Sequence, residues 1–292
     1  MPDASESGTR ARSFEVAAAQ APEIAMVVAS PHSGRDYPPG FLAQARLPAQ
    51  KLRKSEDSFV DELFAAAPAL GAPLIRAHFP RIYVDANREP FELDPRMFEE
   101  RLPDYVNATS PRVAAGLGTI ARVAACGEDI YRAKLPVAEA LDRIKSFYRP
   151  YHAGLRNLVD AAAERFGYCI LLDCHSMPST GHAIEPDAGR TRADFVLGDC
   201  FGEACAPAVI SCAEDTLSAM GFTVRRNVPY AGGYTTRHYG RPKARIHALQ
   251  IEINRALYMD QESFAPTPDF PAVALRMREL MAALGAIDSA HL

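Results

Sequence analysis

The chain has 292 residues, of which 48% are hydrophobic, so it is long enough and apolar enough to bury a large core. Its formal net charge of −4 gives no electrostatic reason to expect binding to nucleic acid. The longest apolar runs are far shorter than the roughly 20 residues that a membrane-spanning helix needs. We therefore expect neither a nucleic-acid-binding protein nor a membrane protein.

The first 20 residues, MPDASESGTRARSFEVAAAQ, are polar and mixed in charge, and they lack the apolar stretch of a secretory signal. The six cysteines show no CxxC spacing, which favours reduced thiols in a cytoplasm. We expect residues 1–20 to be a flexible lead-in and residues 21–292 to form a single domain of a cytoplasmic protein. The composition leaves the oligomeric state open.

The first predicted element is a buried strand over residues 24–29, which the segment SPHSGRDYP follows. The glycine and proline of that segment indicate a tight turn, and the turn carries His32. Farther along, apolar residues at helical spacing predict a helix around residues 59–64. Ser55 is its expected N-cap, which would place Asp57 in the first helical turn.

Short apolar runs predict three further strands, over residues 74–77, 82–85 and 119–123. Residues 136–166 show the clearest helical period of the chain. Pro150 is expected to kink or split this helix, and Gly167 to end it as a C-cap. The helix leads directly into a second buried strand over residues 169–176.

The succession of strand, helix and strand predicts parallel β-α-β units, and therefore an α/β fold. A long polar loop follows the second buried strand and is typical of segments that contact ligands. The remaining pattern predicts a strand and turn in 193–202, a helix in 203–221, a strand and glycine-rich loop in 222–242, a third buried strand in 248–254 and an amphipathic helix in 269–287.

Two histidines occupy matching positions, His32 after the first buried strand and His175 at the end of the second. Ligands of α/β proteins bind at the carboxyl ends of strands. With one acid from the Asp57 region, the two histidines would form a site that holds zinc and leaves a position for water. Glu252, on an otherwise apolar strand, would be the general base. The sequence has no HExxH, so residue types alone leave a metal site and structural histidines equally open.

Other polar residues also have two interpretations. Asn87 and Arg88 follow a predicted strand, where they could bind a carboxylate or, for Arg88, pair with Asp85 or Asp94. Asp173 either orients a neighbouring histidine or pairs with an arginine. A nucleophilic Cys174 is disfavoured, because adjacent residues of a strand point to opposite faces.

Seven segments occur in order over about residues 24–260: SPHSG, SEDSFVDEL, YVDANREPFELDP, LLDCHSMPS, DFVLGD, GGYTTRHYG and LQIEINRALYMD. Together they resemble the N-formylglutamate amidohydrolase (deformylase) family, which is related in fold to zinc carboxypeptidases and aspartoacylase. The resemblance implies a single three-layer α/β/α domain with a mostly parallel mixed central sheet and one zinc ion. It also implies hydrolysis of the N-formyl or small N-acyl amide of an acidic amino acid, such as N-formyl-L-glutamate.

Matched by motif, the resemblance implies His32, Asp57 and His175 as zinc ligands and Glu252 as the residue that activates water. One segment departs from the family pattern. Many members have DTDWH where this chain has SEDSF, so Glu56 remains an alternative ligand to Asp57. We prefer Asp57.

The family's Asn-Arg pair, which grips a substrate carboxylate, corresponds to Asn87 and Arg88. N-formylglutamate has two carboxylates, so a second cationic contact is expected from Arg81 or Arg237. The glycine-rich segment would add backbone and polar contacts from Gly232, Gly233, Tyr234, Thr235 and His238. The alternative for Arg237 and His238 is an ordinary place in a surface loop.

The expected partner is therefore a small N-acyl amino acid. One alternative is an amidohydrolase that acts on another N-acyl amino acid or on a small peptide-like amide. A second alternative is a non-catalytic binding protein on the same scaffold. That protein would be expected to have lost His32, His175 or Glu252, and this chain has all three.

Overall fold

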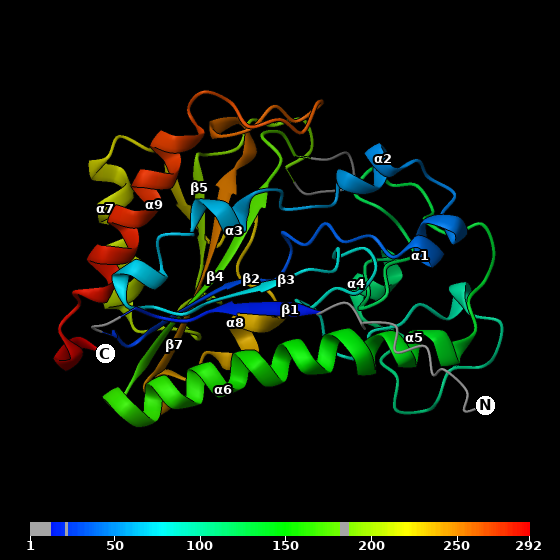
Figure 1. Ribbon diagram of the computed structural model, residues 1–292, viewed down its shortest axis with the longest axis horizontal. Helices are drawn as coiled ribbons and strands as arrows, with labels where there is room; N and C mark the ends of the chain where they lie inside the picture. Colours follow the sequence, from blue (N-terminus) through cyan, green and yellow to red (C-terminus); the bar gives the residue numbers. More distant parts are fainter. Residues whose placement is uncertain (1–12, 21–22, 182–186) are drawn as a thin grey trace, which may run out of the picture.

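The computed structural model describes residues 13–20, 23–181 and 187–292. A seven-stranded sheet with the order β1-β3-β2-β4-β7-β5-β6 forms its centre (Figure 1). The strands are β1 (Phe14–Ala17), β2 (Met26–Ser30), β3 (Leu74–Ala77), β4 (Cys169–Met177), β5 (Phe195–Gly198), β6 (Val224–Arg226) and β7 (Ile246–Asn254).

The sheet is mixed but mostly parallel, as predicted. Strands β3, β2, β4 and β7 run parallel to one another, and β6 runs parallel to β5. The two antiparallel pairs are β1 with β3 and β5 with β7. The carboxyl ends of β2, β4 and β7 consequently meet at one edge of the sheet, which is where an α/β fold places a ligand site.

Helices cover both faces of the sheet and make it the middle of three layers (Figure 1). On one face, α6 contacts β1, β2, β3 and β4. On the other face, α7 packs on α9 and contacts β5, β6 and β7, while α3 contacts β4. The helices are α1 (Pro39–Gln44), α2 (Ala49–Arg53), α3 (Val60–Leu63), α4 (Pro111–Ala114), α5 (Val137–Arg143), α6 (Arg149–Phe166), α7 (Pro207–Ala219), α8 (Tyr234–Tyr239) and α9 (Phe270–Gly285).

Alternation along β4 decides which residues reach the site. Leu172 and Cys174 join the apolar core beneath α7 and α9, whereas Leu171 joins the core beneath α6. Successive side chains of a strand point to opposite faces, so Asp173 and His175 face the same side as Leu171. The prediction that Cys174 and His175 point apart is therefore confirmed.

The predicted strands 24–29, 74–77, 169–176 and 248–254 are confirmed as β2, β3, β4 and β7, as are the later elements β5, α7, β6 and α9. Two predicted strands are wrong. Residues 82–85 form a turn, because the amides of Tyr83 and Val84 bond to Pro80 O. Residues 119–123 form a loop, because the amides of Thr119 and Arg122 bond to carbonyls of Glu92 and Gly116 rather than to a strand. Their apolar side chains are buried between loops, which periodicity alone does not distinguish from a strand.

Three other local predictions need correction. Phe14–Ala17 form strand β1 within the predicted flexible lead-in, while residues 1–12 lie outside the described residues. The helix near residue 59 begins only at Val60, and Ser55 does not cap it: Ser55 Oγ instead accepts a hydrogen bond from the amide of Ala125 at 3.0 Å. The predicted glycine-rich loop contains the short helix α8.

The long predicted helix is present as α5 and α6, joined by the π-helical turn Ile144–Tyr148. Pro150 lies two residues after this turn and inside the continuous helical run, where it cannot donate to the preceding turn and its ring crowds the carbonyl four residues back. The irregularity therefore lies where the predicted kink or split was expected. Gly167 ends α6 with φ of +77°, a left-handed conformation that glycine adopts readily, which confirms the predicted C-cap. Within the described residues, no helix combines the length and the apolar character that crossing a membrane requires.

Candidate metal centre and substrate cavity

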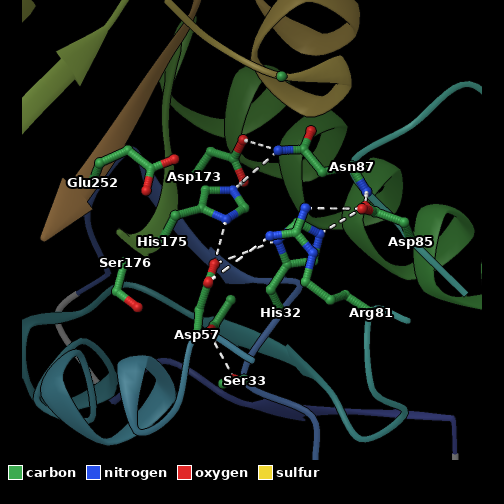
Figure 2. Close-up of polar contacts among 12 residues, drawn as sticks. His32, Ser33, Asp57, Arg81, Asp85, Asn87, Asp173, His175, Ser176 and Glu252 are labelled. Atoms are coloured by element: carbon green, nitrogen blue, oxygen red, sulfur yellow. Dashed lines mark hydrogen bonds and ion pairs between the residues drawn. The ribbon is translucent and has the colours of Figure 1, made fainter. Parts of the chain in front are cut away.

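The strand ends bring the predicted site residues together (Figure 2). In the register of β4 with β7, His175 lies opposite Glu252. His32 follows β2, and its carbonyl accepts a hydrogen bond from the amide of Asp57 at 3.1 Å. This backbone contact draws the segment before α3 to the end of the sheet and delivers the Asp57 carboxylate to the two histidines.

His32, Asp57 and His175 form a compact buried group that could hold a metal ion, since one ligand atom from each lies within 4.8 Å of the others. His175 Nδ1 is 2.9 Å from Asp57 Oδ2, and His32 Nδ1 is 3.4 Å from the same oxygen. All three residues are at most 2% exposed. Two imidazole nitrogens and one carboxylate oxygen converging on one point are the ligand set of a catalytic zinc site.

A carboxylate holds the far nitrogen of each histidine. His32 Nε2 lies 2.7 Å from Asp85 Oδ1, and His175 Nε2 lies 3.0 Å from Asp173 Oδ1. Because a carboxylate accepts a hydrogen bond from each Nε2–H, each imidazole in its neutral form has its lone pair on Nδ1. His32 Nδ1 is buried and has no hydrogen-bond partner among the described residues, as expected of a nitrogen that binds a cation. The donor set therefore fits a divalent metal.

The charges of the group support the same conclusion. Burial opposes ionisation of Asp57, but the adjacent imidazoles of His175 and His32 outweigh it and hold the pKa of that carboxyl well below its usual range. Burial disfavours a charged His175, but the nearby Asp173 charge and the hydrogen bonds to Asp173 and Asp57 raise its pKa well above the ordinary value. The carboxylates therefore stabilise positive charge at the imidazoles, and a bound cation would supply that charge.

Arg255, which follows β7, fixes the other oxygen of Asp57. Its Nη2 donates to Asp57 Oδ1 at 3.0 Å, and its Nε donates to Ser176 Oγ at 3.1 Å. The Nη1 group donates to the carbonyl of Lys54 at 3.1 Å. With Oδ1 engaged by the guanidinium, Oδ2 is the Asp57 oxygen that faces both histidines.

Glu252 lies at the edge of this group and is 8% exposed. Burial raises the pKa of its carboxyl to about 7, and the nearby Asp57 charge adds to that effect while His175 opposes it. Gln250 Nε2 donates to Glu252 Oε1 at 2.8 Å and orients the carboxyl. A carboxyl with this pKa can both accept and release a proton near neutral pH.

Asn87, Arg88 and Arg81 border the metal group on one side. The Asn87 side-chain amide lies 3.1 Å from His175 Nε2, and its Oδ1 accepts a hydrogen bond from the amide of Thr235 at 2.7 Å. Arg81 Nη2 donates to Asp85 Oδ2 at 2.9 Å. Arg88 donates to the carbonyl of Leu117 from Nε, at 2.9 Å, and lies 3.8 Å from Asp85 through Nη2.

These residues line one cavity of about 560 Å³. Its floor is the metal group with Glu252, and its walls come from loops far apart in the sequence, around residues 81–88, 112–125 and 229–237. The wall carries several basic side chains: Lys54, Arg81, Arg88, Arg112, Arg237 and Arg255. A cavity of this size with cations around a buried metal group suits a small anionic ligand.

A family model for N-formylglutamate amidohydrolase matches residues 24–259. The chain belongs to the N-formylglutamate amidohydrolase family. It is 31% identical over 253 residues to an N-formylglutamate deformylase of Pseudomonas putida, covering 82% of this chain and 83% of that protein. It is 30% identical over 266 residues to an N-formylglutamate deformylase of Pseudomonas aeruginosa, covering 89% and 92%. The chain is thus a hydrolase of a family that acts on linear amide C–N bonds.

Solved structures agree with the family. The crystal structure of an N-formylglutamate amidohydrolase from Ralstonia eutropha JMP134 matches with a TM-score of 0.87 and 37% sequence identity, over 93% of this chain and 96% of that chain. The crystal structure of a gene product from Agrobacterium tumefaciens matches with a TM-score of 0.65 at 19% identity, over 94% of this chain and 95% of that one, which shows a shared fold alone.

Glu56, the alternative ligand, faces away from the two histidines of this family member. Its Oε1 accepts a hydrogen bond from Tyr37 at 2.7 Å, and its Oε2 accepts one from Ser58 at 2.9 Å. Arg53 Nε lies 3.3 Å from the same Oε2. The group near the histidines contains Asp57, so the geometry favours Asp57 over Glu56.

The segment 232–238 divides between the cavity and other contacts. Gly232, Gly233 and Arg237 line the cavity, whereas Tyr234, Thr235 and His238 are not part of its wall. Tyr234 stacks on His238, with ring centroids 4.8 Å apart, and His238 Nε2 lies 2.7 Å from Arg156 Nη2. The expected substrate contacts from the side chains of Tyr234, Thr235 and His238 do not match this placement, because α8 turns them away.

Sequence reasoning missed two residues of this centre. Asp85 was considered only as a partner for an arginine, but it also holds His32. Arg255 was not considered, although it follows the strand that carries Glu252 in the segment IEINR. An acid two residues before the Asn-Arg pair was the available signal for Asp85. The Arg255 contact with Asp57 spans 198 positions, and nothing in the sequence indicates it.

Proposed function

We propose that this protein is a zinc-dependent amidohydrolase that removes the N-formyl group, or another small N-acyl group, from an acidic amino acid. N-formyl-L-glutamate, giving formate and glutamate, is the expected substrate. The observation that carries the proposal is the buried His32–Asp57–His175 group beside Glu252, in a cavity with a cationic wall. Family membership supports the same reaction class. Residues 21–292 would form the single hydrolase domain.

In this proposal the side chains of His32, Asp57 and His175 would hold a zinc ion. A zinc ion held there would supply Lewis acidity, which polarises a carbonyl and makes water a stronger acid. Asp85 and Asp173 keep the Nε2 protons on the far side of the imidazoles, and Arg255 keeps Asp57 turned toward them. These contacts prepare the ligands before any metal arrives.

Glu252 acts as the base and then as the acid. It takes a proton from the attacking water, whose oxygen forms a bond to the acyl carbon, and later gives that proton to the amine nitrogen as the C–N bond breaks. Its raised pKa of about 7 suits both transfers. Asn87 and Arg88 bind the carboxylate next to the scissile amide. The positive charge of the neighbouring Arg81 is partly neutralised by Asp85 and Asp57.

A substrate panel tests the proposal. Purified protein is assayed for amine release from formyl, acetyl and succinyl derivatives of glutamate, aspartate, glutamine and methionine, with and without a chelator, and with zinc added back. We expect fastest turnover of a formylated acidic amino acid, loss of turnover with chelator, and recovery with zinc. Preference for a neutral side chain would contradict the acidic-substrate proposal, and chelator-resistant turnover would contradict the metal.

A further inference from the structure

The cavity wall holds more cations than its own acids neutralise. Arg81 is bonded to Asp85, and Arg255 to Asp57. In contrast, Arg112 on α4 has a half-buried side chain that lines the cavity, and its guanidinium forms no hydrogen bond or ion pair with any of the described residues. An unpaired guanidinium in the wall of a cavity favours an anion there.

Arg112 lies beside Arg88, the arginine proposed for the first carboxylate. The backbone of Leu117 joins them: its carbonyl accepts from Arg88 Nε at 2.9 Å, and its amide donates to the Arg112 carbonyl at 2.8 Å. The pKa of Arg88 is lowered to about 10, mainly by burial; the charge of Asp85 opposes this effect, and the charges of Arg81 and Arg112 add to it. Two adjacent guanidinium groups repel each other until an anion lies between or beside them.

We propose that Arg112 is a specificity-determining residue that binds the second carboxylate of a dicarboxylic N-acyl amino acid, beside the first carboxylate on Arg88. The inference rests on the proposed function and extends it to the substrate side chain. A glutamyl side chain is short, so the cation for its far carboxylate must be a neighbour of the cation for its near one. Arg112 meets that requirement, because it lines the same wall and is linked to Arg88 by hydrogen bonds through the backbone of Leu117.

The other candidate cations meet it less well. Arg81 is a neighbour of Arg88, but it already donates to Asp85 at 2.9 Å and lies 3.9 Å from Asp57. Lys54 and Arg237 also line the cavity, yet neither is among the groups that act most strongly on Arg88. The sequence analysis named Arg81 or Arg237 for the second carboxylate, and Arg112 replaces them in this proposal.

Kinetics with two matched substrates test the inference. N-formyl-L-glutamate and N-formyl-L-glutamine have side chains of the same shape, but only the first has the second negative charge. In Arg112→Gln we expect kcat/KM for N-formylglutamate to fall about 10- to 100-fold, mainly through KM, because a charge-assisted contact is lost. Turnover of N-formylglutamine should change less than about 2-fold, since a neutral amide gains little from a guanidinium. Arg112→Lys should recover part of the loss.

The matched control is Arg101→Gln, which removes a positive charge from a side chain that is 88% exposed and outside the cavity wall. It should leave both substrates unchanged. Equal losses for both substrates in Arg112→Gln would show a structural or first-carboxylate role and overturn the inference, as would unchanged kinetics. If the preference for N-formylglutamate over N-formylglutamine were lost in Arg237→Gln but kept in Arg112→Gln, the second carboxylate would be assigned to Arg237. If wild-type protein cleaves neither substrate, the proposed function fails and this inference fails with it.

Discussion

Arg255 donates a hydrogen bond from Nη2 to Asp57 Oδ1 at 3.0 Å, across 198 positions of the chain. Both residues are buried, so the guanidinium balances the carboxylate charge and also decides which oxygen faces the histidines. Removing one member of a buried ion pair leaves the other charge uncompensated, which costs about 3–5 kcal/mol.

We therefore expect Arg255→Met to lower the free energy of unfolding by about 3 kcal/mol and to lower zinc affinity at least about 10-fold. Arg255→Lys keeps the charge but not the fork of donors, so it should recover stability better than zinc affinity. Urea unfolding and zinc retention against a competing chelator measure the two effects. Wild-type zinc affinity in Arg255→Met would show that Arg255 does not position Asp57.

Glu252→Gln keeps the shape of the side chain and removes its ability to accept a proton. We expect kcat to fall about 10²- to 10⁴-fold, the range of general acid–base catalysis, with KM and zinc content near wild type. Steady-state kinetics and elemental analysis of the same preparation check this. Retained turnover in Glu252→Gln would show that Glu252 is not the general base.

Metal removal should weaken both activity and folding. A ligand that binds only the folded protein stabilises it by about 2.7 kcal/mol at 100 times its Kd, so dialysis against a chelator should lower Tm and zinc should restore it. His32→Ala and His175→Ala should each lose zinc and the zinc-dependent part of Tm. His78→Ala is the control, because His78 follows β3, lies 3.8 Å from Glu15 and is not part of the metal group. Full zinc content in both site variants would refute the ligand assignment.

The sequence predicted the parts of the site that lie on or directly after apolar runs. His32, His175 and Glu252 stand out because β2, β4 and β7 are buried on every residue and leave few polar positions to explain. The family resemblance implied Asp57 among the acids of its segment, and it implied that Asn87 and Arg88 bind a carboxylate of the substrate. The fold class followed from the alternation of strands and helices and is confirmed.

The rest depends on contacts between distant segments. Strand 82–85 was predicted wrongly because buried apolar residues in a turn look like a strand. The same turn brings Asp85 to His32, so the error also hid that contact. Arg112 lies on the four-residue helix α4, which is too short to show a helical period in the sequence, and only the bonds through Leu117 place it next to Arg88.

His152 on α6 should contribute a pH dependence of stability. Its Nε2 lies 2.8 Å from the carbonyl of Ala86, directly before Asn87, and burial lowers its pKa to about 4. The His152 imidazole takes up a proton near pH 6.5 in the unfolded chain but only near pH 4 in the folded chain. The contribution of His152 to the free energy of unfolding is therefore fully present above about pH 6.5 and is lost as pH falls toward 4. Between pH 7 and pH 5 the loss is about 2 kcal/mol at most.

In His152→Gln the free energy of unfolding should be lower at pH 7 but should fall less steeply toward pH 5, by up to that same ~2 kcal/mol. Urea denaturation of both proteins at several pH values gives the difference, in which the other titrating groups cancel. Parallel curves for the two proteins would mean that His152 is not held neutral.

Position 233 requires a glycine because the Asn87 side chain lies where a Cβ would be. A Cβ on Gly233 would lie 2.2 Å from Asn87 Nδ2 and 2.4 Å from Asn87 Oδ1, and bonds to Thr235 and the contact with His175 hold that amide in place. Gly233→Ala should therefore displace Asn87 and lower kcat/KM at least about 10-fold, since a small misplacement at a reacting centre is costly. Gly40→Ala on α1 is the matched control, because a Cβ there meets nothing within 4 Å. Activity assays and Tm of both variants separate the local displacement from unfolding, and wild-type kinetics in Gly233→Ala would show that the position of Asn87 does not matter.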